Sequence, residues 1–347
     1  MIKENLFGKT LFELQEIVVK LGFQKFVAKQ LTDWMYKKRI HSFEEMRNLS
    51  KPTREKLAEK YKLSFTDSTS VQESIDGTKK YLFPLKGNQF IETAFIPEGE
   101  RATLCVSSQV GCKMGCLFCM TGKQGFQGNL TAGEILNQIF NLPDFEKLTN
   151  VVYMGMGEPL DNLDEVLKSI EILTADYGLA WSPKRITVST IGIIPAMKRF
   201  LVLSKANLAV SLHSPFEEER KNLMPIESVY HLPKLLDEIR AFEFGGQRRV
   251  SFEYIMFKGV NDQQKHINEL ARILNGIKCR INLIRFHAIP GTPLESSSNE
   301  TILRFQDGLK RKGIVTTIRA SRGEDIFAAC GLLSTKELVK RKKNEVY

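Results

Sequence analysis

The chain has 347 residues, of which 42% are hydrophobic and 26% charged, as in an ordinary soluble protein. It contains no run of about 18 apolar residues that could span a membrane, no recognisable signal peptide, and too few cysteines for a secreted disulfide scaffold, so we expect a reducing, cytoplasmic location. The formal net charge of +10 favours a polyanionic partner, because Lys and Arg side chains neutralise phosphates.

Residues 1–62 are predicted to form a small helical domain. Thr10-Leu11-Phe12-Glu13 is a capping box that starts one helix, Ser42 repeats the capping signal, and Pro52 lies near the start of a later helix. Many basic residues decorate this region, among them Lys25, Lys29, Lys37, Lys38, Arg39, Lys51, Arg54, Lys56, Lys60 and Lys62. The charge pattern alone leaves open whether they form a solvated face or an RNA-contacting arm.

Residues 63–101 are predicted to form a β-hairpin linker. Asp76-Gly77 and Lys86-Gly87-Asn88 are tight-turn signals between strand-like stretches. Glu92 lies within the apolar stretch 90–95. A lone Glu on a strand is more often a solvent-facing residue than a catalyst, so the strand pattern gives Glu92 no role.

Residues 102–333 alternate between strands and helices, which predicts a parallel sheet covered by helices. The expected strands are 102–107, 150–154, 185–191, 206–212, 250–256 and 279–286, followed later by 314–319. The expected helices include one starting near Thr131 and others at 161–174, 216–223, 232–243, 261–274 and 298–312. Six strand–helix units are fewer than the eight that close a full barrel. Residues 334–347 form a basic tail.

Three cysteines, Cys112, Cys116 and Cys119, lie in one short loop after the first of these strands. Three thiolates can hold a [4Fe–4S] cluster by three of its irons and leave the fourth open. A structural zinc ion would need four ligands, and the loop offers no fourth Cys or His. Structural cysteines in a core are a third possibility, although two glycines and a lysine among them do not suit a core.

Other chemically capable residues also follow predicted strands. Gly155 to Pro159 comes after the second strand, Ser189 lies late in the third, Ser211 to His213 end the fourth, and His287 closes the sixth. Because ligands of parallel α/β folds bind at the carboxyl ends of the strands, this order predicts a single active site.

The spacing Cys-x-x-x-Cys-x-x-Cys, with Phe118 before the last cysteine, resembles the signature of radical S-adenosylmethionine (SAM) enzymes. The motifs at 105–112, 153–159, 211–214 and 325–331 resemble those of the RlmN/Cfr family of RNA methyltransferases, and the similarity covers nearly the whole chain in order. The resemblance implies an α/β fold with a partial (βα)6 radical SAM barrel, open on one side, and the small helical domain and hairpin linker ahead of it.

The resemblance also implies roles for individual residues. Cys112, Cys116 and Cys119 would hold the cluster, and two SAM molecules would be used in each turnover. Cys330 would become an S-methylcysteine, Glu92 would accept a proton, and Cys105 would release the product through a transient disulfide with Cys330. The implied SAM contacts are Gly157, Glu158, Ser189, Ser211, Leu212, His213 and His287. The family often has Asn where this chain has His287, and Asp where it has Phe327.

The implied activity is methylation of adenine carbon 2, in 23S rRNA and in tRNA next to the anticodon. A Cfr-type carbon-8 methyltransferase, which protects ribosomes from antibiotics, shares every motif quoted above. A basic iron–sulfur protein that binds RNA without catalysis is a third reading, and it gives no role to Cys105 or Cys330. A flavodoxin-type electron donor is the expected protein partner, with no membrane and no obligate subunit.

Overall fold

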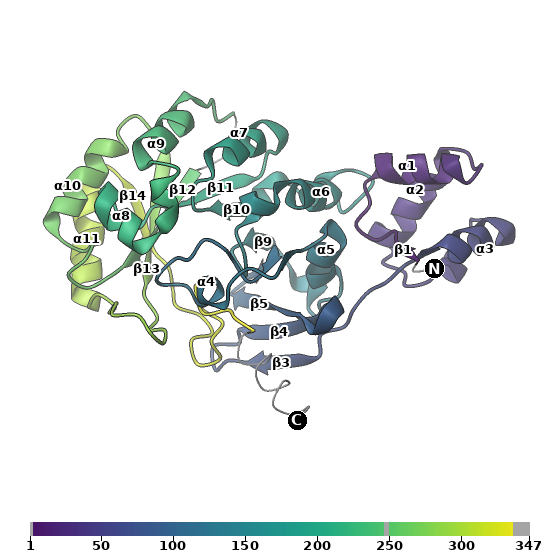
Figure 1. The fold of residues 1–347 in the computed structure, drawn as a ribbon, viewed down its shortest axis with the longest axis horizontal. Coiled ribbons are helices and arrows are strands. Elements are labelled where there is room, and N and C mark those ends of the chain that lie inside the picture. The colour runs from purple at the N-terminus through teal and green to yellow at the C-terminus, as the bar shows by residue number, and fades with distance from the viewer. Residues whose placement is uncertain (1–2, 246–249, 336–347) are drawn as a thin grey trace.

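A computed structural model of the protein describes residues 3–245 and 250–335 (Figure 1). Most of the predicted basic tail, residues 336–347, lies outside these described residues. The central feature is a ten-stranded mixed sheet with the strand order β14-β13-β12-β11-β10-β9-β6-β5-β4-β3. Within the described residues no helix is both long and apolar enough to span a bilayer.

The strands from β6 to β14 in this order pair in parallel. They are β6 (Arg101–Cys105), β9 (Asn150–Tyr153), β10 (Ile186–Thr190), β11 (Asn207–Ser211), β12 (Val250–Met256), β13 (Cys279–Arg285) and β14 (Val315–Ile318). Apolar residues such as Leu104, Val188 and Leu208 are buried against helices on one face, as a covered parallel sheet requires. The predicted strands match these within a few residues.

Helices connect the parallel strands. They are α4 (Met120–Gln124), α5 (Ala132–Phe140), α6 (Leu163–Thr174), α7 (Ile194–Leu203), α8 (Glu217–Leu223), α9 (Leu232–Ala241), α10 (Gln264–Ile273) and α11 (Asn299–Arg311). Local signals set several starts: Thr131 and Glu134 form a capping box before α5, and Ser298 caps α11. The short strands β7 (Gln109–Val110) and β8 (Gly128–Asn129) pair with each other beside the cysteine loop.

The parallel strands curve into a partial barrel. Arg319 directly follows β14, yet its guanidinium lies 3.5 Å from Sδ of Met154, which directly follows β9. In a flat sheet these strand ends would be about 24 Å apart, five steps of about 4.8 Å. Since β14 and β6 are not neighbours in the sheet order, the barrel is open, and the expected partial barrel of α/β class is confirmed.

The 63–101 region extends this sheet with three antiparallel strands, β3 (Ser70–Glu73), β4 (Lys79–Pro84) and β5 (Phe90–Glu98). Both expected turns are present, with Gly77 and Gly87 at positive φ. The region expected as a hairpin linker is therefore an edge of the barrel sheet itself, because β5 pairs directly with β6.

The N-terminal helices lie at one end of the molecule, beside α5 and α6 (Figure 1). They are α1 (Leu11–Lys20), α2 (Phe26–Thr32) with the π-helical turn η1 (Asp33–Lys37), the 3₁₀ turn η2 (Phe43–Glu45) and α3 (Lys51–Lys60). The parallel pair β1 (Glu4–Asn5) and β2 (Tyr61–Lys62) joins the ends of this unit.

Close packing fixes the N-terminal unit to the barrel. A side chain at Gly8 would clash with the backbone of Gly133 at the start of α5, and Phe7 packs edge-on against Phe140, with ring centroids 5.3 Å apart. Their side chains belong to the same hydrophobic core as the barrel. The unit therefore packs directly against α5.

Candidate active site

One face of the parallel strands lines the barrel interior and carries polar side chains. Pairing in register places Cys105 beside Val152, and Ser211 beside Glu253. Paired residues of a parallel sheet share a face, and residues two apart on one strand share it too. The interior row therefore contains Cys105, Ser189, Ser211, Glu253, Asn282 and Thr317. Three of the predicted site residues thus face one space.

The cysteine loop closes the carboxyl end of β6. Gly111 and Gly115 adopt positive φ, and a side chain on Gly111 would clash with the carbonyl of Gly125, so the loop folds back tightly on itself. Its thiols are not joined in disulfides. The three cysteines pack in a hydrophobic cluster of their own with apolar side chains that include Met224 and Phe286.

The electrostatics of these thiols fit an iron–sulfur cluster. Burial raises the pKa of Cys112 to about 12, with nearby Cys119 and Glu158 adding to the shift. Burial and the two neighbouring thiols also raise the pKa of Cys116 well above its ordinary value. Two such buried thiols become thiolates together only around a strongly cationic partner, which iron supplies.

The glycine-rich turn after β9 packs against the backbone that precedes the cysteine loop. Gly157 has φ +99°, and a Cβ there would lie 2.5 Å from Cβ of Gln109, so only glycine fits. The Glu158 amide donates to Oε1 of Gln109 at 2.8 Å. This bond joins the two loops.

Glu158 is a buried carboxyl group in this turn. Its oxygens accept the amides of Leu160 and Ile191, at 3.1 and 3.0 Å. Burial raises its pKa to about 7, although these hydrogen bonds oppose the shift. Among the described residues Glu158 has no Lys or Arg partner within 4 Å, so an ammonium group such as that of SAM would supply the missing cation.

At the ends of β10 and β11, some predicted SAM-binding side chains face the barrel interior and others are buried in the core. Ser189 and Ser211 face the interior, whereas the Leu212 side chain is fully buried in the main core, so only its backbone can contact a ligand. His213 is buried at φ +56°, and its Nδ1 accepts the amide of Ile255 at 3.0 Å. Burial lowers its pKa to about 3, so the imidazole is neutral with its Nε2–H free to donate.

Arg220 on α8 binds the backbone at the ends of β10 and β11. It is fully buried, and its Nη2 donates to the carbonyls of Ile191 and Ser211, at 2.8 and 3.2 Å. Its Nη1 forms an ion pair with buried Glu227. Arg220 therefore fixes the turns after β10 and β11.

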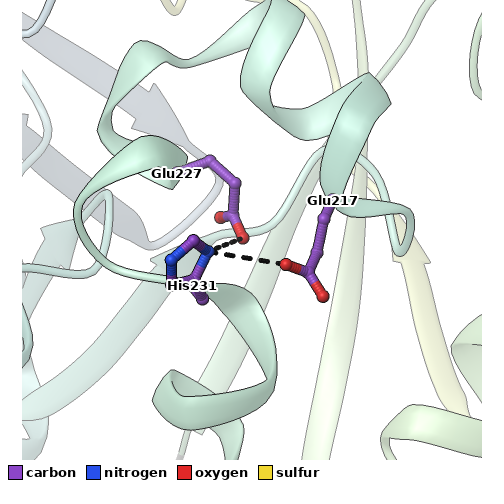
Figure 2. Close-up of side chains that lie close together, drawn as sticks. All are labelled: Glu217, Glu227 and His231. Atoms are coloured by element: carbon purple, nitrogen blue, oxygen red, sulfur yellow. Dashed lines mark ion pairs between the residues drawn. The ribbon is translucent and has the colours of Figure 1, made fainter.

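Glu227 also belongs to a group with Glu217 and His231, whose ligand atoms lie within 4.8 Å of one another (Figure 2). Nδ1 of His231 lies 3.5 Å from Glu217 and 3.9 Å from Glu227. Because the Arg220 guanidinium already binds the Glu227 carboxylate, its positive charge opposes a metal ion there.

Cys105 and Cys330 lie near each other at the mouth of the barrel, where the parallel strands end. Cys105 is buried at the end of β6, and Cys330 is exposed in the C-terminal loop; both are free thiols. Nη1 of Arg319 lies 3.9 Å from Sγ of Cys330. Burial raises the pKa of Cys105 to about 12, Cys330 adds to the shift and Arg319 opposes it. The structure thus brings together two cysteines that are distant in sequence, with Arg319 beside them.

The loop that carries Cys330 is anchored on its N-terminal side by the β3–β4 turn. Asp325 accepts the Ser74 hydroxyl at 2.5 Å and the Ile75 amide at 3.2 Å. In return, Asp76 accepts the Gly323 amide at 2.9 Å. Hydrogen bonds from Thr78 and Gly323 outweigh burial and lower the pKa of Asp76 to about 2.

On its C-terminal side the same loop is anchored to α4, next to the cysteine loop (Figure 1). The Met120 amide donates to the Gly331 carbonyl at 2.8 Å, and the Thr121 hydroxyl donates to the Leu333 carbonyl at 2.6 Å. Cys330 is therefore held between two fixed points.

Glu92 lies on β5 near this loop and is 5% exposed. Its oxygens contact Nζ of Lys80 at 3.1 Å and the amide of Ser334 at 2.9 Å. Burial raises its pKa, while Lys80 opposes the shift. Glu92 is thus not the solvent-facing residue that the strand pattern favours. His287 is buried, and its Nδ1 lies 3.2 Å from Glu324, which precedes Cys330 in the same loop.

Arg220, Glu253 and Asp325 are among the residues of this site that have no role in the sequence-based expectations. The signal for Glu253 was available, because a carboxylate inside the otherwise apolar strand 250–256 needs a buried partner. Arg220 lies among charged residues of a surface-like helix, and nothing in its pattern distinguishes it from solvated neighbours.

Two family models match the chain. Residues 106–271 match the radical SAM superfamily, and residues 4–63 match the N-terminal domain of the ribosomal RNA large subunit methyltransferase. The superfamily implies a [4Fe–4S] cluster and SAM, which the cysteine loop and the Glu158 turn fit.

Full-length relatives agree with these models. The chain is 59% identical over 332 residues to the probable dual-specificity RNA methyltransferase RlmN of Porphyromonas gingivalis, covering 96% of this chain and 97% of the relative. It is 54% identical to that of Bacteroides thetaiotaomicron, covering 99% and 100%. A radical SAM methyltransferase from Sphaerobacter thermophilus superimposes with a TM-score of 0.88 at 38% identity, covering 95% of this chain and 99% of that one. The chain therefore belongs to the RlmN family of radical SAM RNA methyltransferases.

Proposed function

We propose that the protein methylates carbon 2 of adenine in 23S rRNA and in the tRNA adenosine on the 3′ side of the anticodon. The observation that carries this proposal is the meeting of Cys105, Arg319 and Cys330 at the mouth of the barrel. A methyl carrier and a resolving thiol must come within bonding reach of each other, and the two anchors of the Cys330 loop hold one of them there.

Each residue then has a defined task. Cys330 accepts a methyl group on Sγ from a first SAM, with its S–C bond forming as the sulfonium bond of SAM breaks. A second SAM and the cluster, when bound, supply the radical that activates this methyl group. Glu92 takes the proton lost from carbon 2, and the cluster, when bound, would take up the one electron that the radical adduct loses. Sγ of Cys105 then attacks Sγ of Cys330, so that the S–S bond forms as the bond between Cys330 and the methylene carbon breaks. A proton adds to that carbon, which completes the methyl group on the released base and leaves a disulfide.

The binding residues follow the same assignment. Cys112, Cys116 and Cys119 hold the cluster by three irons. Gly157, Glu158, Ser189, Ser211, Leu212, His213 and His287 contact SAM, with Glu158 on its ammonium group and Leu212 through its backbone. The basic N-terminal unit, residues 1–62, contacts the RNA, and a flavodoxin-type donor returns electrons to the disulfide and the cluster. We place the enzyme in the cytoplasm, where these RNAs and a reducing pool occur.

Two other functions remain as outcomes to test. A carbon-8 methyltransferase would use the same cysteines, because carbon 8 needs the same methyl carrier and resolving thiol. A non-catalytic iron–sulfur RNA-binding protein would need neither Cys105 nor Cys330. The Arg319 guanidinium contacts Cys330 and interacts electrostatically with Cys105, which favours a catalytic role.

The test is mass spectrometry of a defined rRNA fragment and a tRNA anticodon stem-loop after anaerobic reaction with SAM and reductant. Wild type is compared with Cys330→Ala and with Cys279→Ala, a matched cysteine on β13. We expect 2-methyladenosine from wild type and Cys279→Ala, and none from Cys330→Ala. An 8-methyladenosine product would assign the carbon-8 function, and equal products from all three proteins would remove Cys330 from the mechanism.

A further inference from the structure

Arg319 presents hydrogen-bond donors to the reacting sulfur, and its carboxylate partner forms only a long ion pair with it. Its Nη1 and Nη2 lie 3.5 and 3.6 Å from Sδ of Met154, and Nη1 lies 3.9 Å from Sγ of Cys330. Sulfur is a weak acceptor, whereas a guanidinium carries five N–H donors. The nearest carboxylate in the described chain, that of Glu253, lies 3.7 Å from Nε. Arg319 therefore has donors left for a ligand.

Glu253 offers a hydrogen-bond acceptor that complements these donors. It is 4% exposed, and its Oε1 accepts the Ser251 hydroxyl at 3.0 Å and the Asn282 amide at 2.8 Å. Asn282 is itself fixed by the Thr317 hydroxyl at 2.6 Å. Oε2, on the Arg319 side, is buried without a hydrogen-bond partner among the described residues. This oxygen forms a long ion pair with Nε of Arg319, at 3.7 Å, and still has room to accept a hydrogen bond from a ligand donor.

These groups follow one another in a fixed order across the barrel mouth. The Glu253 oxygen lies on the Nε side of Arg319, and the Cys330 sulfur lies on its Nη1 side. In space, the order of groups is therefore an acceptor on Glu253, the donors of Arg319 and the methyl-carrying sulfur of Cys330.

We propose that Glu253 and Arg319 form the subsite that reads the target adenine, which rests on the carbon-2 function proposed above. The edge of adenine presents the same order: the N6 amino donor, the N1 acceptor and carbon 2. Glu253 accepts from N6, Arg319 donates to N1, and carbon 2 then faces Cys330. Guanine presents an oxygen at position 6 and a donor at N1, so it meets like groups at both places.

The other edge of adenine has a similar order, with N6, N7 and carbon 8. The same two residues could therefore read either edge, and the ring nitrogen that Arg319 contacts decides which carbon reaches Cys330. This gives the subsite a test that is separate from the test of the carbon-2 function.

The experiment uses anticodon stem-loops with adenosine, 1-deazaadenosine or 7-deazaadenosine at the target position, bound to the reconstituted enzyme with S-adenosylhomocysteine. Fluorescence anisotropy gives the dissociation constant of each complex for wild type, Arg319→Met and the control Arg322→Met, whose native guanidinium lies 4.0 Å from Glu98. We expect 1-deazaadenosine to weaken wild type and Arg322→Met about 10- to 100-fold, as a lost hydrogen bond to a charged group does. Arg319→Met should bind adenosine and 1-deazaadenosine equally.

The measured binding penalties distinguish a failure of the adenine subsite from a failure of the carbon-2 function. The same 1-deazaadenosine penalty in Arg319→Met as in wild type would overturn the subsite, even if the product is 2-methyladenosine. A penalty for 7-deazaadenosine instead, together with an 8-methyladenosine product, would keep the Arg319 contact and overturn the carbon-2 function. Should Arg319→Met not fold, Glu253→Gln with a purine riboside that lacks the 6-amino group serves as the second pair. There, the loss of the N6 penalty supports the subsite, and its persistence overturns it.

Discussion

The protein has two groups of thiols, built in opposite ways. Cys112, Cys116 and Cys119 lie in one tight loop and pack among apolar side chains. Cys105 and Cys330 come from a strand end and a C-terminal loop, and they meet beside the cationic Arg319. A contiguous loop fixes its ligands by local backbone geometry, whereas the pair depends on every contact that holds the C-terminal loop in place.

The largest expected effect tests the contiguous group. Cys116→Ser should abolish methylation and iron binding, because two remaining thiolates cannot hold the cluster by three irons. Iron content and the visible absorption of the anaerobically reconstituted protein measure the loss. The matched Cys279→Ser variant should keep both, and a cluster of normal occupancy in Cys116→Ser would remove Cys116 from the ligand set.

The next effect tests the assembled pair. Cys105→Ala should still methylate Cys330 from SAM but should stop before release, since no thiol can attack Cys330. We expect a protein–RNA adduct on denaturing gels and a drop in turnover of at least about 1,000-fold, the scale of losing a group on which the step depends. Free methylated RNA at the wild-type rate would show that release needs no resolving thiol.

A smaller effect tests the anchor that brings the pair together. Asp76→Asn/Asp325→Asn weakens the bonds from the β3–β4 turn to the Cys330 loop, and we expect methylation to fall about 5- to 20-fold, the scale of one or two hydrogen bonds. Cys105–Cys330 disulfide formation under mild oxidant should slow in parallel, while iron content stays unchanged. Asp237→Asn, on the surface of α9, is the control. A normal disulfide rate would mean that the loop is held by its α4 contacts alone.

SAM binding by Glu158 should depend on pH. Its pKa of about 7 lies above the ordinary 4.5, so the free protein loses its carboxylate below pH 7 and SAM affinity should fall about tenfold per pH unit there. Because the folded pKa is raised, stability is highest at low pH and is lost as pH rises through 7. Glu158→Gln should therefore stabilise the ligand-free protein at pH 8, by up to about 3 kcal/mol, and not at pH 5. Equal denaturation midpoints for both proteins at pH 8 would contradict this.

The smallest expected effect concerns the N-terminal basic surface. Lys38 already contacts the Trp34 ring and Asp33, whereas Lys37 is exposed. Lys37→Glu/Lys38→Glu should weaken RNA binding a few-fold and reduce its salt dependence, as the loss of one or two phosphate contacts does. An unchanged salt slope would make these lysines a solvated face.

Much of the molecule could be read from local sequence. The capping box at Thr10 starts α1, and the cysteine spacing places three thiols in one loop. The alternation of strands and helices predicted the parallel sheet, because the hydrophobic period and the length of each segment depend only on residues close together in the chain.

The tertiary structure alone decided the rest. The edge strands β3–β5, the buried state of Glu92 and the ion pair of Glu253 with Arg319 all depend on contacts between distant segments. The meeting of Cys105 and Cys330 was implied by the family resemblance, but the anchors that produce it, Asp76 and Asp325, are ordinary surface-type residues in the sequence. Curvature of the sheet brings the end of β14 within side-chain reach of the end of β9, and no local pattern encodes that curvature.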